Sequence, residues 1–221
     1  MARFKGALTG LIPVIIMALI LFISSGRLDW IMAWLLLGIH MVGTIFISLK
    51  ISSELIDERV QEKDGIKNWD VILVRVMNMV GLAVLLVAGL DIRFGWSGSF
   101  PLLVEIIAMA VVIVGYVILA WAAISNDYFS RVVRIQEERG HSVITGGPYR
   151  YIRHPGYLGL ILCAIAQPAM LGSLWALIPA IFTVIILLVR TNLEDKTLQD
   201  ELAGYKDYIL QVRYRLFLGV W

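Results

Sequence analysis

Residues 101–125 read PLLVEIIAMAVVIVGYVILAWAAIS, a nearly unbroken apolar stretch. Among Asp, Glu, Lys and Arg, it contains only Glu105. A helix needs about 20 mainly apolar residues to cross the ~30 Å hydrocarbon core of a bilayer. Residues 71–90, 30–49 and 7–24 form three further stretches of this kind. Because each is long enough to span a bilayer, the sequence predicts an all-α polytopic membrane protein.

Two more apolar stretches, residues 155–171 and 173–189, follow with only a short turn at Gly172 between them. We therefore expect six spans, of which the last two form a tight helical hairpin. Proline interrupts helical hydrogen bonding, so kinks are predicted at Pro168 and Pro179. At ~1.5 Å per residue the fifth span reaches only about 25 Å, so we expect it either to tilt little or to enter the bilayer incompletely.

Composition supports the membrane class and excludes others. The 221 residues are 59% hydrophobic and 16% charged, whereas soluble domains are about 45–50% apolar and about 25% charged. The mean hydropathy is +0.82. A net charge of +2 gives no basis for a nucleic-acid partner. The chain's one cysteine, Cys163, excludes an intrachain disulfide and a cysteine metal cluster, and no metal site is predicted.

The distribution of basic residues predicts the orientation in the membrane. With six spans, every Lys and Arg except Arg27 and Arg93 falls on the side that holds both termini. Cytoplasmic segments carry the excess of Lys and Arg, so both termini are predicted to be cytoplasmic. Residues 190–215 are predicted to form an amphipathic helix, packed on that membrane surface or against the loop 126–154, because one face carries Leu193, Leu198, Leu202, Tyr205 and Ile209. We divide the chain into a four-span region, 1–125, and a C-terminal catalytic region, 126–221.

The most informative segment is GGPYRYIRHPGYLG, residues 146–159, where a cytoplasmic loop meets the fifth span. Pro155 fits the first position of a helix and forces His154 out of helical conformation. Arg150 and Arg153 precede it, and a helix N-terminus beside arginines suits a carboxylate or phosphate. Taken singly, these residues also fit a structural interpretation, since basic residues anchor spans at headgroups. His141, in the polar loop before this segment, is interpreted as solvated.

A second polar cluster, Arg190, Glu194 and Asp195, ends the sixth span. Arg190 and Glu194 are four residues apart and share a helix face. They could form a surface ion pair worth less than ~1 kcal/mol. Alternatively, Glu194 could accept hydrogen bonds from the hydroxyl or ammonium group of a ligand. The hairpin would bring Glu194 close to His154, which favours the second interpretation.

The segment GPYRYIRHPGYLG (147–159), followed by RTNLEDKTLQDELAGYKDY (190–208), resembles the isoprenylcysteine carboxyl methyltransferases and phospholipid methyltransferases. The family pattern is R-H-P-x-Y-x-G, a helical hairpin, an acidic pair and spaced tyrosines. The resemblance covers about residues 143–215. It departs at Asp195, because the family often has Glu-Glu at the acidic pair and an aspartate is shorter.

The resemblance implies a membrane-embedded methyltransferase that uses S-adenosyl-L-methionine. It implies catalytic roles for Arg153, Glu194 and Arg190. The cofactor-binding residues that it implies are Gly147, Pro148, Tyr149, Arg150, His154, Pro155, Tyr157, Leu158, Gly159 and Glu194. Its partners would be the lipid bilayer and a lipophilic small-molecule or prenylated substrate; the sequence does not define an oligomeric state.

Several alternatives stay open for the function. The acceptor is expected to be a prenylcysteine-type carboxylate, but a phospholipid amine, a thiol or another small hydrophobic acceptor is compatible. Sterol-type membrane reductases, which use NADPH, have a similar R-H-P-x-Y-x-G-E segment, but Leu160 stands here at the position of the final glutamate. A non-catalytic subunit or transporter would be expected to carry charged residues near the midplane.

Overall fold

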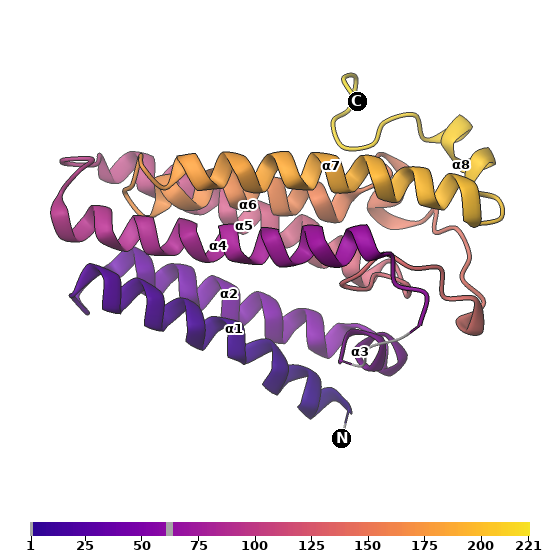
Figure 1. Cartoon of the computed structure of the whole chain (residues 1–221), viewed down its shortest axis with the longest axis horizontal. Coiled ribbons are helices and arrows are strands. Elements are labelled where there is room, and N and C mark those ends of the chain that lie inside the picture. The colour runs from indigo at the N-terminus through magenta and orange to yellow at the C-terminus, as the bar shows by residue number, and fades with distance from the viewer. Residues whose placement is uncertain (1, 61–63) are drawn as a thin grey trace.

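The computed structural model describes residues 2–60 and 64–221, and over this part of the chain every regular element is helical. The long helices run side by side along one axis, with both ends of the chain toward the same end of the bundle (Figure 1). The α-helices are α1 (Ala2–Ser25), α2 (Ile31–Lys50), α3 (Ser53–Val60), α4 (Asn68–Phe94), α5 (Leu102–Ile124), α6 (Pro155–Met170), α7 (Leu177–Glu201) and α8 (Tyr205–Gln211). Two 3-10 helices, η1 (Glu137–Arg139) and η2 (Gly147–Arg150), lie in the loop between α5 and α6.

Four helices, α2, α4, α5 and α7, are long and apolar enough to cross a membrane. The apolar part Gly10–Ser25 of α1 and the 16-residue α6 are shorter. The all-α polytopic fold predicted from the sequence is therefore confirmed, while six is an approximate number of spans. The predicted α6–α7 hairpin is also present, with residues 171–176 as its turn.

The predicted separation between a sixth span and an amphipathic helix is wrong. Instead, α7 continues without a break through Arg190 to Glu201. Gly204, three residues after the end of α7, has a left-handed backbone (φ 81°) and precedes the separate helix α8. The predicted kink at Pro179 is also wrong, because Pro179 lies in the first turn of α7, where backbone N–H groups have no intrahelical acceptor.

Helices α5 and α6 cross with their backbones in direct contact. A Cβ atom added to Gly115 would lie 2.7 Å from the Gly159 carbonyl oxygen, and one added to Gly159 would lie 2.6 Å from the Gly115 carbonyl oxygen. Such a crossing needs glycine on both helices. It fixes the short helix α6 against α5, and thereby fixes the depth of the α6 N-terminus at one end of the bundle.

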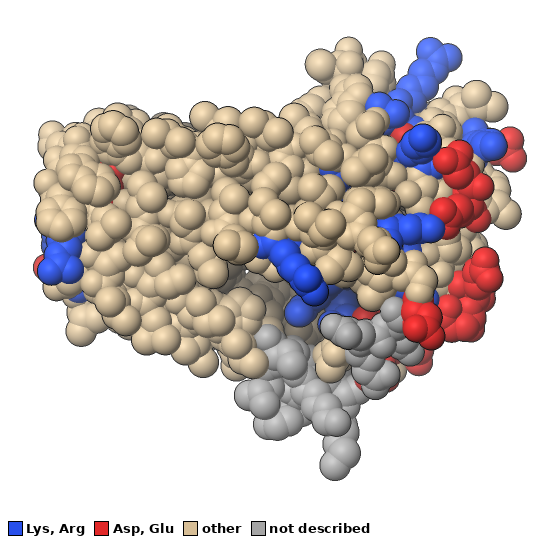
Figure 2. Space-filling model, viewed as in Figure 1, with Lys and Arg blue, Asp and Glu red and all other residues tan. Residues whose placement is uncertain are grey.

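Charged side chains gather at one end of the molecule, whereas its long sides are mainly uncharged (Figure 2). This end, hereafter the charged end, holds α3, α8 and the loop between α5 and α6 (Figure 1). At the opposite end, Asp91 is buried and accepts hydrogen bonds from Ser97 and Ser173, which ties two connecting loops together. Large apolar side chains are exposed along the sides, as expected for a surface in contact with lipid.

Candidate functional site

A cavity of about 180 Å³ opens at the charged end. Its walls come from the α5–α6 loop, the first turn of α6, the last turns of α7, and α8. Six of the residues implicated by the sequence line it: Tyr149, Arg153, His154, Tyr157, Arg190 and Glu194. The hairpin thus joins the two polar clusters of the sequence in one cavity, hereafter the main cavity.

The start of α6 is held by the C-terminal tail. His154 precedes Pro155 in a non-helical conformation, as predicted for a residue before proline. The backbone N–H of Arg153 donates to the Tyr214 carbonyl over 2.9 Å, and that of His154 donates to the Arg215 carbonyl over 2.9 Å. These two backbone hydrogen bonds join the C-terminal tail to the turn before α6 and thereby hold Arg153 and His154 in place.

Asp195 joins α7, α6, α8 and the tail. Its carboxylate is fully buried and takes part in five side-chain contacts. The contacts are with Arg153 Nη1 at 3.1 Å, His154 Nε2 at 3.2 Å, Tyr205 hydroxyl at 2.9 Å, Arg215 Nε at 2.9 Å and Gln199 Nε2 at 2.8 Å. A buried carboxylate needs such compensation, so Asp195 acts as the structural centre of this end.

Arg190 does not form the surface ion pair that the sequence allowed. It is buried, and its Nε lies 2.6 Å from Asp70 Oδ1, while Nη2 donates to the Arg131 carbonyl over 2.8 Å. Asp70 also accepts the Val133 backbone N–H over 2.7 Å. The surface interpretation is therefore wrong, because the partner of Arg190 is a carboxylate on α4, 120 positions earlier. The guanidinium carbon lies 5.3 Å from the centroid of the Tyr157 ring.

Glu194 differs from these paired groups. It is partly buried, lines the main cavity and accepts a hydrogen bond from the Tyr157 hydroxyl. Within the described part of the chain, no Lys, Arg or His forms an ion pair with it. A carboxylate has about four acceptor positions, so Glu194 keeps acceptor capacity that faces the cavity.

Arg153 also has unused capacity. It is buried on the wall of the main cavity, and its Nε has no hydrogen-bond partner among the described residues. An orphaned N–H on a buried guanidinium is rare in native structures and calls for a ligand or water. The cavity is therefore lined by Glu194, an under-used anionic acceptor, and by Arg153, whose buried Nε has no hydrogen-bond partner among the described residues.

Aromatic side chains cover much of the remaining wall. Tyr128, Phe129, Tyr149 and Tyr157 all line the main cavity. Tyr149 is fixed because its backbone carbonyl accepts the Tyr208 hydroxyl over 2.6 Å, and burial raises the pKa of its own hydroxyl. Rings placed in this way can stack on a planar ligand or face a cation.

The place of His141 in a polar loop suggested that it is solvated. The structure instead shows it partly buried. It lines the main cavity and stacks on Tyr128 with ring centroids 4.3 Å apart. Burial, with the charges of Arg139 and Arg134, lowers the pKa of His141 to about 4. The ring is therefore neutral at physiological pH, and its Nδ1 accepts the Gln136 backbone N–H over 3.3 Å.

The other residues implicated by the sequence lie away from the cavity wall. Arg150 is exposed, and Leu158 packs in an apolar cluster with Ile161, Leu187 and Leu216. Pro148 and Pro155 are buried, Gly147 lies against Ser125 and Trp121, and Gly159 lies against α5.

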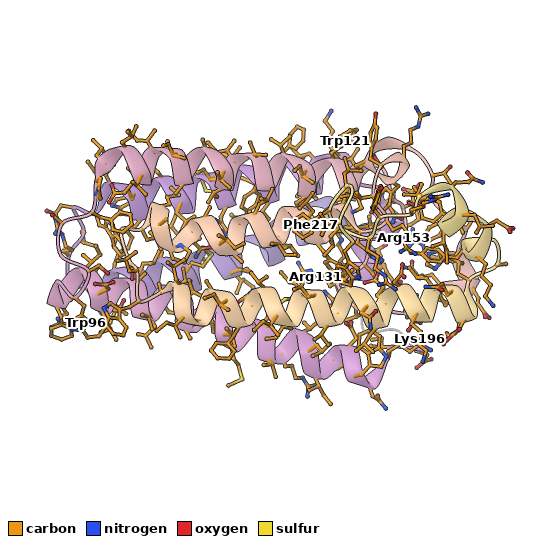
Figure 3. All side chains as sticks on the ribbon, turned by 90° about the horizontal axis from the view of Figure 1, so that it is seen from above. Trp96, Trp121, Arg131, Arg153, Lys196 and Phe217 are labelled. Atoms are coloured by element: carbon orange, nitrogen blue, oxygen red, sulfur yellow. The ribbon has the colours of Figure 1, made fainter. Side chains whose placement is uncertain are left out.

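Sequence reasoning did not single out Asp70, Phe129 or Arg215, since their partners are distant in the chain. Phe129 packs against Gly156 in the first turn of α6, where an added Cβ atom would lie only 2.6 Å from the ring. The loop between α5 and α6 is therefore seated directly on the start of α6. Figure 3 shows Arg153 and Arg131 at this charged end and Trp96 at the opposite end.

Comparison with known proteins converges on the same region. Residues 106–200, from α5 to the end of α7, match the isoprenylcysteine carboxyl methyltransferase (ICMT) family. A probable protein-S-isoprenylcysteine O-methyltransferase of Oryza sativa subsp. indica is 39% identical over 69 residues, which cover 31% of this chain and 36% of the relative. Protein-S-isoprenylcysteine O-methyltransferase A of Arabidopsis thaliana is 31% identical over 77 residues, 34% of this chain and 36% of the relative.

A third relative, the protein-S-isoprenylcysteine O-methyltransferase of Schizosaccharomyces pombe, is 33% identical over 49 residues, 22% of this chain and 21% of the relative. The chain thus spans about a third or less of the length of these relatives. The matched region nevertheless contains the α6–α7 hairpin, the R-H-P turn, Glu194 and Asp195. Residues 106–200 of the chain are thus similar to the isoprenylcysteine carboxyl methyltransferase family.

Proposed function

We propose that this protein is an integral membrane methyltransferase that uses S-adenosyl-L-methionine and methylates the carboxylate of a lipophilic, prenylcysteine-type acceptor. The observation that carries the proposal is the incompletely paired wall of the main cavity, formed by Arg153 and Glu194 inside the family-matching region. A charged group that faces a cavity without an ion-pair partner, as Glu194 does, is characteristic of a ligand site.

The chemistry of this wall fits the proposed cofactor. S-adenosyl-L-methionine carries a carboxylate, an ammonium group, ribose hydroxyls, a sulfonium cation and an adenine ring. The unpaired Arg153 Nε suits the carboxylate, and Glu194 suits the ammonium group or the ribose hydroxyls. Tyr128, Phe129 and Tyr149 offer faces for adenine or for the sulfonium. The wall therefore offers a group of the complementary kind for the carboxylate, for the ammonium group or the ribose hydroxyls, and for adenine or the sulfonium.

The reaction requires little acid–base chemistry from the chain. The bound cofactor would supply an electrophilic methyl group; a C–O bond forms to the acceptor, the C–S bond breaks, and its electron pair stays on sulfur. A carboxylate acceptor is already ionised at neutral pH, so no general base is needed. The chain would orient the acceptor oxygen in line with the methyl carbon and exclude water.

The position of the main cavity supports access from two directions. Leu119 of α5 and Leu160 of α6 line it, so its apolar part adjoins two helices of the membrane region. Its polar part opens among the charged loops, which the excess of Lys and Arg favours as the cytoplasmic side. A lipophilic acceptor would enter from the bilayer, and the soluble cofactor from the cytoplasm.

A hydrogen bond in the wall favours one second candidate. The Glu194 carboxylate, which accepts from Tyr157, could take a proton from an amine, so phospholipid amine N-methylation is the alternative reaction. The comparisons do not favour an NADPH-dependent reductase or a non-catalytic subunit, because the relatives are methyltransferases by name.

Cofactor binding provides the first test. Calorimetry on the detergent-purified protein should show saturable binding of S-adenosyl-L-methionine and none of NADPH. Glu194→Gln should weaken binding at least ~10-fold, which corresponds to about 1.4 kcal/mol. Asp200→Asn, a change at an exposed acid on the same helix, should leave binding unchanged. Equal loss in both variants, or binding of NADPH alone, would overturn the site assignment.

The acceptor requires a second measurement. Mass spectrometry should detect a methyl ester after incubation with a farnesylated cysteine carboxylate and S-adenosyl-L-methionine. Phosphatidylethanolamine should stay unmodified under the same conditions. Methylation of the amine and not of the carboxylate would replace the first candidate reaction by the second.

A further inference from the structure

A second cavity, of about 150 Å³, lies at the charged end between α1, α2, α3 and the α5–α6 loop. Two arginines, Arg59 of α3 and Arg131 of the loop, line it together with the hydroxyl-bearing side chains Thr44 and Ser48 of α2. Its lining shares no residue with that of the main cavity. Figure 2 shows basic side chains set back in a hollow on one face of this end.

Arg59 lacks a counter-anion in the described part of the chain. Its Nε and Nη2 donate to the Phe129 carbonyl over 3.0 and 2.8 Å, and its guanidinium carbon lies 5.4 Å from the Phe129 ring centroid. A carbonyl and a ring fix the direction of the guanidinium but leave its charge uncompensated. The remaining N–H groups of Arg59 stay available to a further acceptor.

Arg131 adds a second positive charge to the same cavity. Its side chain is exposed and makes no hydrogen bond or ion pair to any residue that the structure describes. Burial, together with the charge of Arg131, lowers the pKa of Arg59 to about 10. Two guanidinium groups close enough to influence each other attract an anion between them.

The other buried arginines of this end show that the absence of a carboxylate is unusual. Arg134 pairs with Glu58, Arg190 with Asp70, and Arg153 with Asp195. A structural role for a buried arginine in this protein therefore comes with an acidic partner. The partly buried Arg59 has no such partner among the described residues, and it shares one cavity with the exposed Arg131, which favours an external anion.

The rest of the lining identifies the kind of anion. The lining also has apolar surface from three isoleucines: Ile47 in α2, Ile51 at the C-cap of α2, and Ile56 in α3. The cavity also lies where the membrane-crossing helix α2 ends, at Lys50, which is the depth of lipid headgroups. A phosphate group with acyl chains beside it matches both the paired guanidiniums and the apolar walls.

We propose that the cavity between Arg59 and Arg131 binds the phosphate group of an anionic phospholipid, as a site separate from cofactor and acceptor. One segment, residues 129–131, forms a wall between the two cavities. The Phe129 carbonyl accepts from Arg59 while Phe129 also lines the main cavity, and the Arg131 carbonyl accepts from Arg190. The bound lipid would therefore restrict the motion of Phe129 and Arg190, which line the main cavity.

Native mass spectrometry of the full chain tests the proposal. Phosphatidylglycerol should be retained about tenfold more strongly than phosphatidylcholine, the ratio that corresponds to about 1.4 kcal/mol. Arg131→Gln removes a side chain without described contacts, so it should fold normally and lose most of this preference. Arg59→Lys keeps the charge and should keep part of the preference. The matched control is Lys196→Gln, which removes an exposed charge from α7 outside the cavity and should change nothing.

Two outcomes would overturn the proposal. One is equal retention of both lipids by the unmodified protein; the other is an unchanged preference in Arg131→Gln. Inorganic phosphate distinguishes the two sources of the anion: if it displaces phosphatidylglycerol at equal concentration, the site binds soluble phosphate and not a lipid. These readouts do not depend on methyl transfer, so the proposal and the proposed function can fail separately.

Discussion

Asp195 and Glu194 are consecutive in α7, yet they belong to two different parts of the charged end. Asp195 belongs to a framework of buried ion pairs that also includes Asp70–Arg190 and Glu58–Arg134. Glu194 belongs to the wall of the main cavity, where Tyr157 is its one hydrogen-bond partner in the described structure. Each carboxylate of the framework has an arginine partner, whereas Glu194 on the wall has no ion-pair partner among the described residues and can accept further hydrogen bonds.

This difference separates residues that hold the site from residues that would bind a ligand. Removing one partner of a buried ion pair leaves an uncompensated charge, so framework changes should lower stability. Changing a wall group that lies outside these ion pairs, such as Glu194 or Tyr157, leaves the framework paired as before, so it should lower ligand affinity alone.

The largest effect is expected for Asp195→Ala. This change leaves Arg153, His154 and Arg215 without their common carboxylate, at a cost of about 3–5 kcal/mol. Thermal unfolding in detergent should show a much lower midpoint, or little folded protein should be recovered. Asp200→Asn serves as the control on the same helix. An unchanged midpoint for Asp195→Ala would contradict the assignment of a framework role.

A smaller loss of stability is expected for Glu58→Gln. Glu58 binds Arg134 through both oxygens, at 2.6 and 2.8 Å, and ties α3 to the α5–α6 loop. Arg134 also contacts Glu138, so part of its charge stays compensated and the cost should be about 1–3 kcal/mol. The exposed Glu138 allows a matched comparison, because Glu138→Gln should cost clearly less. If Glu138→Gln costs more, burial does not decide the strength of the pair.

On the wall, Tyr157→Phe should change affinity without changing stability. The variant removes the hydroxyl that donates to Glu194 but keeps the ring beside Arg190. Loss of one hydrogen bond to the carboxylate should weaken binding of S-adenosyl-L-methionine about 3- to 10-fold, or about 1 kcal/mol. Calorimetry and thermal unfolding of the same sample separate the two effects. A lower unfolding midpoint with unchanged affinity would move Tyr157 into the framework.

The smallest effect is a pH dependence due to His141. Its pKa is about 4 in the folded protein, while an unfolded histidine titrates near a pKa of about 6.5. The unfolded chain therefore takes up a proton first, and stability should fall as the pH drops from about 6.5 towards 4. His141→Gln keeps an acceptor for Gln136 and should flatten this part of the curve. Parallel curves for the two proteins would show that His141 is not responsible.

The sequence predicts local features of this protein better than its long-range pairings. Apolar length predicted the helices, and Pro155 correctly predicted the non-helical His154 and the start of α6. The hairpin correctly brought Glu194 into the same cavity as His154. Each of these depends on short stretches of chain, where helix geometry and proline sterics decide the outcome.

The partners of the charged residues could not be predicted in the same way. Arg190 could pair with Glu194 one turn away or with any acid brought near by folding, and the buried Asp70 is its partner. The environment of His141 likewise depends on Tyr128, which the loop folds back against it. The continuation of α7 beyond Arg190 follows from these same contacts, since Asp195 is buried among partners from three other segments.

The backbone pairing between the C-terminal tail and the turn before α6 has a consequence for biosynthesis. The four described helices that are long and apolar enough to cross a membrane have all been synthesised before Tyr214 and Arg215 leave the ribosome, yet these two residues complete the bonds to Arg153 and His154. A product terminated before Tyr214 would insert into the membrane with an unsupported R-H-P turn. Competence of the site would thus follow translation of the tail, and prematurely terminated chains would be inserted but inert.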